Sequence, residues 1–300
     1  MLDRLKDYSI IYSFDRSGYQ RHARHFDNID DQYIRGRRFL ITGGTSGIGA
    51  ALAERLTNQG ASVVVTGRDA SKFEQSGLEQ ASIDFLKLDM ADFSALMNEP
   101  FGQFDGLVCN AGGMPNNLKL INDEYDLIFA SQVVGHYLLI RRFIEQGLLP
   151  DGAPIHITSS GGMYMQKLDL DDLCWQETPY DKVKSYANAK RAQVILNQEL
   201  PNRYPGYRFS CSHPGWVGTD ALREALPGFT GRLEKRLRTN DEGADTIHWC
   251  LAQGASLPNG EFWFDRAPRK VYPFFWTRES DTTRARLLAL CETAWAEQIA

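Results

Sequence analysis

From residue 37 onward, short apolar runs alternate with longer segments in which apolar residues return every three or four positions. The runs are typical of strands buried on both faces, and the longer segments are typical of amphipathic helices. We expect strands at 38–41, 62–66, 83–88, 106–109, 155–158, 209–212 and 261–264. We expect helices at 48–58, 124–146, 183–203, 242–251 and 282–299. This alternation predicts an α/β fold, a doubly wound parallel sheet of about seven strands with helices on both faces.

The first thirty-four residues show no clear period and combine aromatic with charged side chains. The aromatic residues are Tyr8, Tyr12, Phe14, Tyr19, Phe26 and Tyr33. We expect residues 1–34 to form an N-terminal arm, partly helical and packed on a single domain of residues 35–300. The mixed charges favour this packing over a membrane-surface role. Residues 161–179 and 216–239 are expected to be irregular connections.

The composition is that of an ordinary soluble protein. The chain has 300 residues and a formal net charge of −5, which argues weakly against nucleic acid as a partner. No apolar run approaches the roughly 20 residues of a transmembrane helix, and charged residues interrupt the start of the chain where a secretory signal is apolar. Five scattered cysteines without a CxxC pair indicate free thiols, and scattered histidines indicate no metal site. We therefore expect a cytoplasmic protein.

A glycine-rich turn, Thr42-Gly-Gly-Thr-Ser-Gly-Ile-Gly49, follows the first predicted strand and opens the first long helix. Gly43 can adopt a backbone angle closed to other residues, while Gly47 and Gly49 allow close approach of backbone and helix. The start of the helix would present free N–H groups to a diphosphate. Plain tight-turn packing is the alternative, but the strand–turn–helix context favours a nucleotide site on a Rossmann-type sheet.

The end of the second strand bears on which nucleotide binds. An NAD site typically places a carboxylate there to hold the ribose 2′-hydroxyl, whereas an NADP site needs cationic donors for the 2′-phosphate. Here Val65 is followed by Thr66, Gly67 and Arg68, and a guanidinium can hold a phosphate with two parallel bonds. Asp69 comes next, so a surface pair of Arg68 with Asp69 is the alternative. The sequence favours NADP(H) over NAD(H) as the cofactor.

Two short pieces between residues 155 and 190 suggest catalysis. Ser159 and Ser160 follow the fifth predicted strand, and Tyr186 and Lys190 lie four apart in the next helix. Four residues make about one helical turn, so the phenol and the ammonium share one face. An ammonium beside a phenol favours the phenolate, which predicts a lowered pKa for Tyr186. A hydroxyl such as Ser160 could orient a carbonyl oxygen beside that phenol, although a solvated helix face is the alternative for this pair.

These motifs together resemble the short-chain dehydrogenase/reductase family over roughly residues 37–264. The matching pieces are the TGGTSGIG turn, Asp89 after the third strand, Asn110-Ala-Gly112 after the fourth, Ser160 after the fifth, YANAK at Tyr186–Lys190, and Pro214-Gly215 with Thr219 after the sixth. Their order makes the resemblance specific. Further pieces, among them His213-Pro-Gly-Trp216 and Gly243-Ala-Asp-Thr246, are similar to the subgroup called dehydrogenase/reductase family member 12.

The resemblance implies a role for each matching residue. Tyr186 would be the general acid/base, Lys190 would hold the nicotinamide ribose, and Ser160 would bond the substrate oxygen. The cofactor would contact Gly43, Ser46, Gly47, Ile48, Gly49, Arg68, Asp89, Asn110, Ala111, Gly112, Tyr186, Lys190, Pro214, Gly215 and Thr219.

One position departs from the family pattern. The family usually has an asparagine on the long fourth helix, three residues before a glycine, where it helps to hold a water that connects the lysine to solvent. Aligning Gln132 and Gly135 with that pattern puts a glutamine in its place. Gln132 is therefore expected in the catalytic set, with a proton relay that is either displaced or weakened.

The leading interpretation is an NADP(H)-dependent oxidoreductase that interconverts a carbonyl and an alcohol. Its partner would be a small molecule, and the apolar composition of residues 216–229 indicates a lipophilic one. The rival interpretation is a catalytically weak nucleotide-binding protein with a regulatory or redox-sensing role, favoured by Gln132 and opposed by the intact catalytic set. A lyase or epimerase that uses the same tyrosine is a third interpretation. Oligomerisation is left open, and the apolar cluster at 272–276 is expected to pack on the arm, contact a partner subunit or line the substrate mouth.

Overall fold

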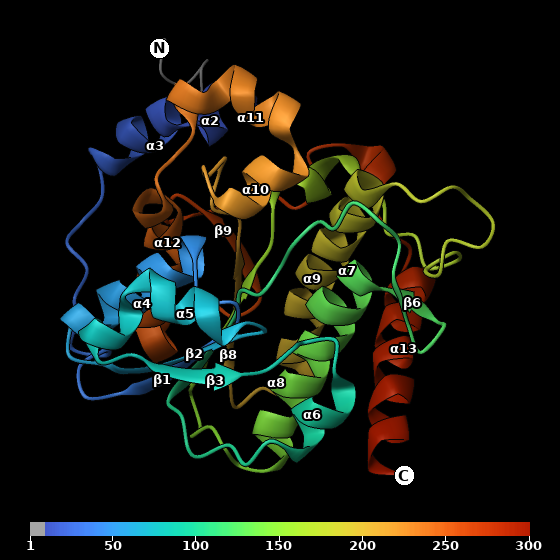
Figure 1. The fold of residues 1–300 in the computed structure, drawn as a ribbon, viewed down its shortest axis with the longest axis horizontal. Helices are drawn as coiled ribbons and strands as arrows, with labels where there is room; N and C mark the ends of the chain where they lie inside the picture. The colour runs from blue at the N-terminus through green and yellow to red at the C-terminus, as the bar shows by residue number, and fades with distance from the viewer. Residues whose placement is uncertain (1–9) are drawn as a thin grey trace.

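The computed structural model describes residues 10–300 and contains one eight-stranded sheet (Figure 1). The strand order is β10-β9-β8-β7-β4-β1-β2-β3, and neighbouring strands are parallel except β10 with β9. The strands are β1 Arg38–Ile41, β2 Ser62–Gly67, β3 Asp84–Lys87, β4 Gly106–Cys109, β7 Pro154–Thr158, β8 Arg208–Ser212, β9 Glu261–Phe264 and β10 Ala267–Pro268. The predicted doubly wound parallel sheet is confirmed, and β10 adds an antiparallel edge that was not predicted.

The two faces of the sheet follow from the alternation of side chains along each strand. In β1, Leu40 joins the core on one face, whereas Phe39 and Ile41 join the core on the other. The first core is covered by α6 Phe93–Asn98, α8 His136–Glu145, α9 Lys182–Arg203 and α13 Asp281–Ile299. The second core is covered by α4 Gly47–Asn58, α5 Ala70–Ser76 and α12 Asn240–Gln253. Figure 1 shows the first group on the right and the second group on the left.

Some elements were missed by the sequence pattern. Residues 216–239 are not an irregular connection, because they contain α10 Asp220–Ala225 and α11 Pro227–Leu233. Thr219 caps α10 by accepting from Leu222 N, and Pro227 begins α11, so local end signals rather than periodicity mark these short helices. A small hairpin of β5 Leu120–Ile121 and β6 Tyr125–Asp126 was also not predicted.

The predicted helix over 124–146 consists of three consecutive helical segments. It consists of α7 Leu127–Phe129, the π-helical turn η2 Ala130–Gly135, and α8. Contrary to the expectation from apolar runs, residues 127–145 have the length and composition of a membrane span, with mean hydropathy 1.2. However, 78% of this apolar stretch is buried inside the protein, as in the core helix of a soluble domain. The π-helical turn packs tightly, since a Cβ added to Gly135 would lie 1.9 Å from the Met90 oxygen.

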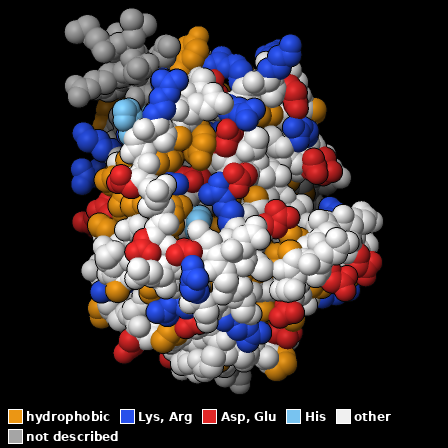
Figure 2. Space-filling model, turned by 90° about the vertical axis from the view of Figure 1, so that its left-hand side faces the viewer, with side chains coloured by type: hydrophobic (Ala, Val, Ile, Leu, Met, Phe, Trp, Pro, Cys, Tyr) orange, Lys and Arg blue, Asp and Glu red, His pale blue; other side chains and the backbone are white. Residues whose placement is uncertain are grey.

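The arm is helical and packed where the structure describes it. It contains α2 Ile10–Phe14 and α3 Arg16–Ala23, and its residue Tyr8 lies outside the described residues. Asp15 caps α3 by accepting from Gly18 N, and Phe14 is buried in the main core. Figure 2 shows acidic and basic side chains interspersed over the face of the molecule that includes α3 and α4. The division of the chain at residues 34 and 35 stays a prediction.

Candidate active site

The glycine-rich turn lies between β1 and α4 and is bonded to the end of β4. The Asn110 amide donates to the carbonyl oxygens of Thr42 and Gly43 at 3.2 and 3.1 Å. Gly43 has φ 65°, and a Cβ added there would lie 2.6 Å from the Ala111 Cα. A Cβ added to Gly49 would lie 2.5 Å from the Gly43 oxygen. Both positions therefore need glycine, and β1 and β4 are the neighbours at which the strand order changes direction, where such sheets bind ligands.

The start of α4 is suited to hold a diphosphate. Ser46 is its N-cap residue and is exposed, but its side chain makes no capping hydrogen bond. The first N–H groups of the helix therefore remain available to an anion, with the partial positive charge of the helix start behind them. Gly47, with φ 59°, comes close to Thr219, since its added Cβ would lie 3.1 Å from the threonine methyl group. Ile48 follows at the same helix start.

The outer strands carry the two predicted residues for the adenosine end. Arg68 follows β2 and is exposed, and within residues 10–300 no hydrogen bond or ion pair to its guanidinium is found. Asp69 does not pair with Arg68 but caps α5, accepting from Ser71 N at 2.9 Å and from Ser71 Oγ at 2.7 Å. Asp89 follows β3 and accepts from Ala91 N at 3.0 Å.

The three predicted catalytic side chains meet at the end of β7. The Lys190 ammonium lies 5.3 Å from the centre of the Tyr186 ring and donates to the carbonyl oxygen of Thr158, the last residue of β7, at 2.9 Å. Ser159 Oγ donates to the carbonyl oxygen of Lys190 at 2.8 Å, which joins strand and helix a second time. Ser160 caps the 3-10 helix η3 Gly161–Met165 and is hydrogen-bonded to Tyr186.

The prediction that Lys190 lowers the pKa of Tyr186 is wrong for the protein without cofactor. Burial raises the pKa of Tyr186, and the hydrogen bond with Ser160 opposes this rise without cancelling it. Burial also lowers the pKa of Lys190 to about 7, so near neutral pH its charge is only partly present. Desolvation therefore outweighs the charge–phenol attraction that the four-residue spacing suggested.

Gln132 lies on the π-helical turn and faces the lysine helix. Its amide nitrogen donates to the Gly113 oxygen at 2.8 Å, while its Oε1 is buried without a hydrogen-bond partner among the described residues. Its carbonyl oxygen accepts from Gln193 Nε2 at 2.8 Å, and Gln193 Oε1 accepts from Lys190 Nζ at 3.1 Å. Gln193, which the sequence analysis did not single out, is thus a buried bridge between Gln132 and Lys190. Its position three residues after Lys190, on the same helical face, was the available signal.

The segment after β8 is held from the other side by buried charges. The fully buried Arg238 donates to the Pro214 oxygen at 3.2 Å and pairs with Asp265 at 2.6 Å. Burial alone would raise the pKa of Asp265, but Arg238 and His22 lower it to about 2. Gly215 has φ 82°, and a Cβ added to it would lie 2.3 Å from the Arg238 Nε.

The arm reaches this same segment. Arg238 also donates to the carbonyl oxygens of Ser13 and Phe14, at 3.0 and 2.9 Å, and Trp216 N donates to the Phe14 oxygen at 2.9 Å. The Phe14 ring packs against His213 with centroids 4.3 Å apart. A Cβ added to Gly161, the residue after Ser160, would lie 2.6 Å from that ring. Arg238 and Asp265 were missed because single charged residues outside a motif give no sequence signal, and Phe14 was named only as one of the arm's aromatic residues.

Comparisons with known proteins agree with this geometry. The family model described as short chain dehydrogenase matches residues 37–169. Dehydrogenase/reductase SDR family member 12 of Bos taurus is 36% identical, with 94% of each chain covered. Retinol dehydrogenase 12 of Homo sapiens is 28% identical, over 77% of this chain and 78% of that protein. This chain belongs to the short-chain dehydrogenase/reductase family.

A solved member of this family extends the likeness to three dimensions. The short chain dehydrogenase from Burkholderia cenocepacia J2315 in complex with NADP superposes with a TM-score of 0.61 at 25% identity. The alignment covers 77% of this chain and 96% of that one. The chain is therefore a member of an oxidoreductase family, with the fold of a relative whose crystal structure holds NADP, a nicotinamide dinucleotide. Its residues fit such a cofactor, because the start of α4 is uncapped and the orphaned Gln132 Oε1 faces Gly112.

All five cysteines are free and four of them are buried, which confirms the expected free thiols. Burial raises the pKa of Cys109 well above its ordinary value, so this thiol is a core residue rather than a nucleophile. Residues 10–300 contain no group of three clustered histidine, cysteine or acidic side chains that could hold a metal ion.

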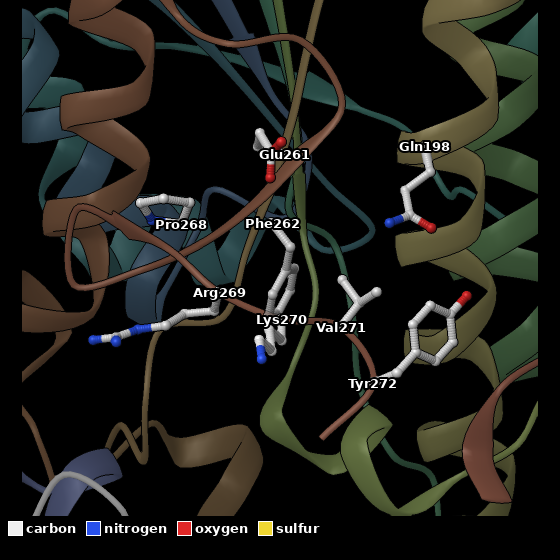
Figure 3. A pocket seen from close by; sticks show the side chains of 8 residues that line it. All are labelled: Gln198, Glu261, Phe262, Pro268, Arg269, Lys270, Val271 and Tyr272. Carbon is white, nitrogen blue, oxygen red and sulfur yellow. The ribbon is translucent and has the colours of Figure 1, made fainter. Parts of the chain in front are cut away.

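A pocket of about 490 Å³ lies elsewhere along α9 (Figure 3). It is formed by Gln198, Glu261, Phe262, Pro268, Arg269, Lys270, Val271 and Tyr272. Gln198 comes twelve residues after Tyr186, about 18 Å along the helix at 1.5 Å per residue. None of the predicted catalytic or cofactor residues lines this pocket, so it is separate from the candidate active site.

Proposed function

We propose that this protein is an NADP(H)-dependent oxidoreductase that interconverts a carbonyl and an alcohol, with Tyr186 as general acid/base. The observation that supports it most is the meeting of Ser160, Tyr186 and Lys190 at the carboxyl end of β7. This group lies next to the segment after β4, because a Cβ added to Gly112 would be 3.6 Å from Lys190 Nζ. The hydride donor site and the proton donor would therefore share one edge of the sheet.

A nicotinamide dinucleotide, when bound, supplies the hydride for reduction and takes it up for oxidation. In the reducing direction Tyr186 holds its proton at neutral pH, because burial raises its pKa, and gives it to the substrate oxygen as charge develops there. Ser160 donates a second hydrogen bond to that oxygen and orients it. Lys190, anchored on the Thr158 oxygen, provides a partial positive charge beside the phenol ring.

We place the 2′-phosphate of NADP(H) on Arg68. The guanidinium is exposed at the end of β2, and no competing partner is found for it in the described part of the chain. Asp69, the residue that could have neutralised it, caps α5 instead. A carboxylate for a free 2′-hydroxyl is also missing at Gly67. These observations support NADP(H) over NAD(H).

We further propose a lipophilic substrate. Trp216 packs edge-on against Phe229 of α11, with ring centroids 5.2 Å apart, and edge-on against Phe14 of the arm, with centroids 6.0 Å apart. Aromatic rings of the arm and of α11 therefore flank the segment that follows β8. Retinol dehydrogenase 12, at 28% identity, carries in its name a lipophilic alcohol of this kind.

Replacing Tyr186 with phenylalanine tests the mechanism. The variant keeps the ring but cannot transfer a proton, so turnover should fall by roughly 10²–10⁴-fold while NADPH binding is retained. A panel of apolar aldehydes, ketones and alcohols, followed by NADPH absorbance, provides the assay. Normal turnover by Tyr186→Phe on a substrate of the wild type would refute the assigned role.

Replacing Arg68 with alanine tests the cofactor preference. Loss of a charge-assisted contact to phosphate should weaken NADPH binding by roughly 10- to 100-fold. NADH, which lacks the phosphate, should bind the variant as it binds the wild type. The neighbouring Lys72→Ala provides a matched exposed cation on α5. Equal losses for both nucleotides, or a wild type that prefers NADH, would contradict the assignment.

A further inference from the structure

The segment that joins β10 to α13 exposes an aromatic cluster at the 3-10 helix η6 Phe275–Thr277. Phe275 is 86% exposed and Trp276 is 52% exposed. The Trp276 ring stacks on Phe274, with centroids 4.6 Å apart, and meets Phe275 edge-on, with centroids 5.4 Å apart. A cluster of large apolar side chains in water marks an interaction surface.

The loop that carries these exposed rings is held at both ends by hydrogen bonds and an ion pair. The buried Arg191 donates to the Val271 oxygen at 2.8 Å and to the Thr277 oxygen at 3.0 Å, and it pairs with Glu279. The Tyr272 hydroxyl donates to Glu279 at 2.8 Å. The loop is thus closed at both ends around one arginine of α9, and its aromatic tip is presented by a fixed base.

Basic residues flank this tip along the chain. Residues 266–278 contain Arg266, Arg269, Lys270 and Arg278 and no acid, in a chain whose formal net charge is −5. Arg266 pairs with Asp245, but the other three cations are exposed, and no ion pair to them is found over residues 10–300. Figure 3 shows Arg269 and Lys270 pointing away from Gln198, and Glu261 is the acidic side chain that lines the same pocket.

An aromatic tip beside lysine and arginine matches the chemistry of a membrane interface. Rings can enter the boundary between headgroups and acyl chains, while the cations meet anionic headgroups. We propose that residues 269–278 dock this protein on an anionic membrane surface. Self-association through this loop is disfavoured, because a symmetric contact would bring the cations of two copies together.

Docking here would also affect how substrate is reached, if the function proposed above is correct. Arg191, which braces the loop, directly follows Lys190 on α9 and touches Met163 of the segment after Ser160. The helix that carries the candidate site would be held next to the bilayer, from which a lipophilic substrate can partition. The membrane contact itself does not depend on this function.

Vesicle flotation of the full chain tests the proposal. The vesicles contain phosphatidylcholine alone or phosphatidylcholine with phosphatidylserine at the share of a cytoplasmic leaflet. The wild type should bind the second kind more tightly, and added salt should weaken that binding. Phe275→Ser/Trp276→Ser should lose roughly tenfold or more of the binding, and Lys270→Ala should lose roughly fivefold.

Matched controls separate this surface from general effects. Ile299→Ser removes an apolar side chain that is 62% exposed at the end of α13, and Lys235→Ala removes an exposed cation near α11; both should bind vesicles as the wild type does. NADPH binding, measured on every variant, shows that the fold is intact. The proposal is overturned if the wild type ignores phosphatidylserine, or if the double variant binds like Ile299→Ser. Dissociation of an oligomer by the double variant, without vesicle binding by the wild type, would assign the surface to a second copy.

Discussion

The two sides of the candidate site are built in different ways. The cofactor side comes from short contiguous motifs, with the turn at 42–49 anchored by Asn110 through backbone carbonyl oxygens. The opposite side joins distant parts of the chain, because Arg238 bonds the oxygen of Phe14, which lies 224 positions earlier. The cofactor side therefore depends on backbone shape. The opposite side, where the arm meets the segment after β8 and which we call the arm side, depends on the buried pair of Arg238 with Asp265 and on aromatic packing.

This difference has an energetic consequence. Backbone turns lose stability when a side chain is added, since the added carbon has nowhere to go. A buried ion pair loses stability when one partner is removed, since the other charge stays behind without compensation. The following changes test this contrast, from the largest expected effect to the smallest.

Removing the acid of the arm side should be the most destabilising change. Asp265→Ala leaves the buried Arg238 unpaired, so the free energy of unfolding should fall by about 3–5 kcal/mol. Glu234→Ala, which breaks the exposed pair with Arg223, should cost less than about 1 kcal/mol. Urea unfolding measures both. Replacing Asp265 and Arg238 together with leucine should recover part of the loss, and equal small effects of the two single changes would contradict the contrast.

Adding one carbon should damage the cofactor side. Gly43→Ala places a Cβ 2.6 Å from the Ala111 Cα at a residue with φ 65°, so we expect a loss of about 1–2 kcal/mol from the backbone angle alone. NADPH affinity should fall as the turn moves. Gly113→Ala is the matched control, because nothing lies within 4 Å of the added carbon there. Titration with NADPH and thermal unfolding compare the two variants, and indistinguishable results would remove the turn from the cofactor site.

Breaking the bridge that Gln193 forms between α9 and the π-helical turn η2 should have a smaller effect, on turnover. Gln193→Leu removes the acceptor of Lys190 and the donor to the Gln132 oxygen, and we expect roughly a tenfold loss of turnover. The lost hydrogen bond favoured the charged lysine, so the pKa of Lys190 should fall further below about 7. The limb of the pH–rate profile that reports Lys190 should move to lower pH. Gln193→Glu keeps an acceptor and adds a negative charge beside Lys190, so it should move that limb to higher pH instead. An unchanged profile in both variants would make Gln193 a packing residue.

Acid should weaken both sides through their buried histidines. Burial lowers the pKa of His136 on the cofactor side, of His213 beside the arm and of His156 in β7 to about 3. The unfolded chain binds these protons below 6.5 and the folded chain does not, so stability is complete above pH 6.5 and is lost as the pH falls towards 3. Each histidine contributes about 1.4 kcal/mol per pH unit in that window.

His213→Phe tests the pH dependence assigned to His213. The variant keeps the ring that stacks on Phe264 with centroids 4.2 Å apart, although it loses the acceptor for Gly215 N. The slope of unfolding free energy against pH should fall by about 1.4 kcal/mol per unit, whatever the variant's stability at neutral pH. The same slope as the wild type would show that His213 binds its proton in the folded protein.

Most of the sheet could be predicted because its strands are short, continuous apolar runs, such as Phe39-Leu-Ile41, that only a sheet buried on both faces explains. The helices α10 and α11 could not be predicted, since each has fewer than two full turns of pattern. The lowered pKa expected for Tyr186 failed for a different reason. Spacing gives the distance between two groups along a helix, but burial depends on everything else that packs around them.

The sequence by itself determined the family and the positions of the motifs, because glycine angles, capping residues and helical spacing act between near neighbours in the chain. It also showed Arg68 at the end of its strand and Gln132 in place of the usual asparagine. Only the tertiary structure decided that Asp69 caps a helix, that Gln193 joins Gln132 to Lys190, and that the arm holds the segment after β8. Such contacts join residues that are distant in the chain, and desolvation and ion pairing depend on the folded surroundings rather than on sequence distance.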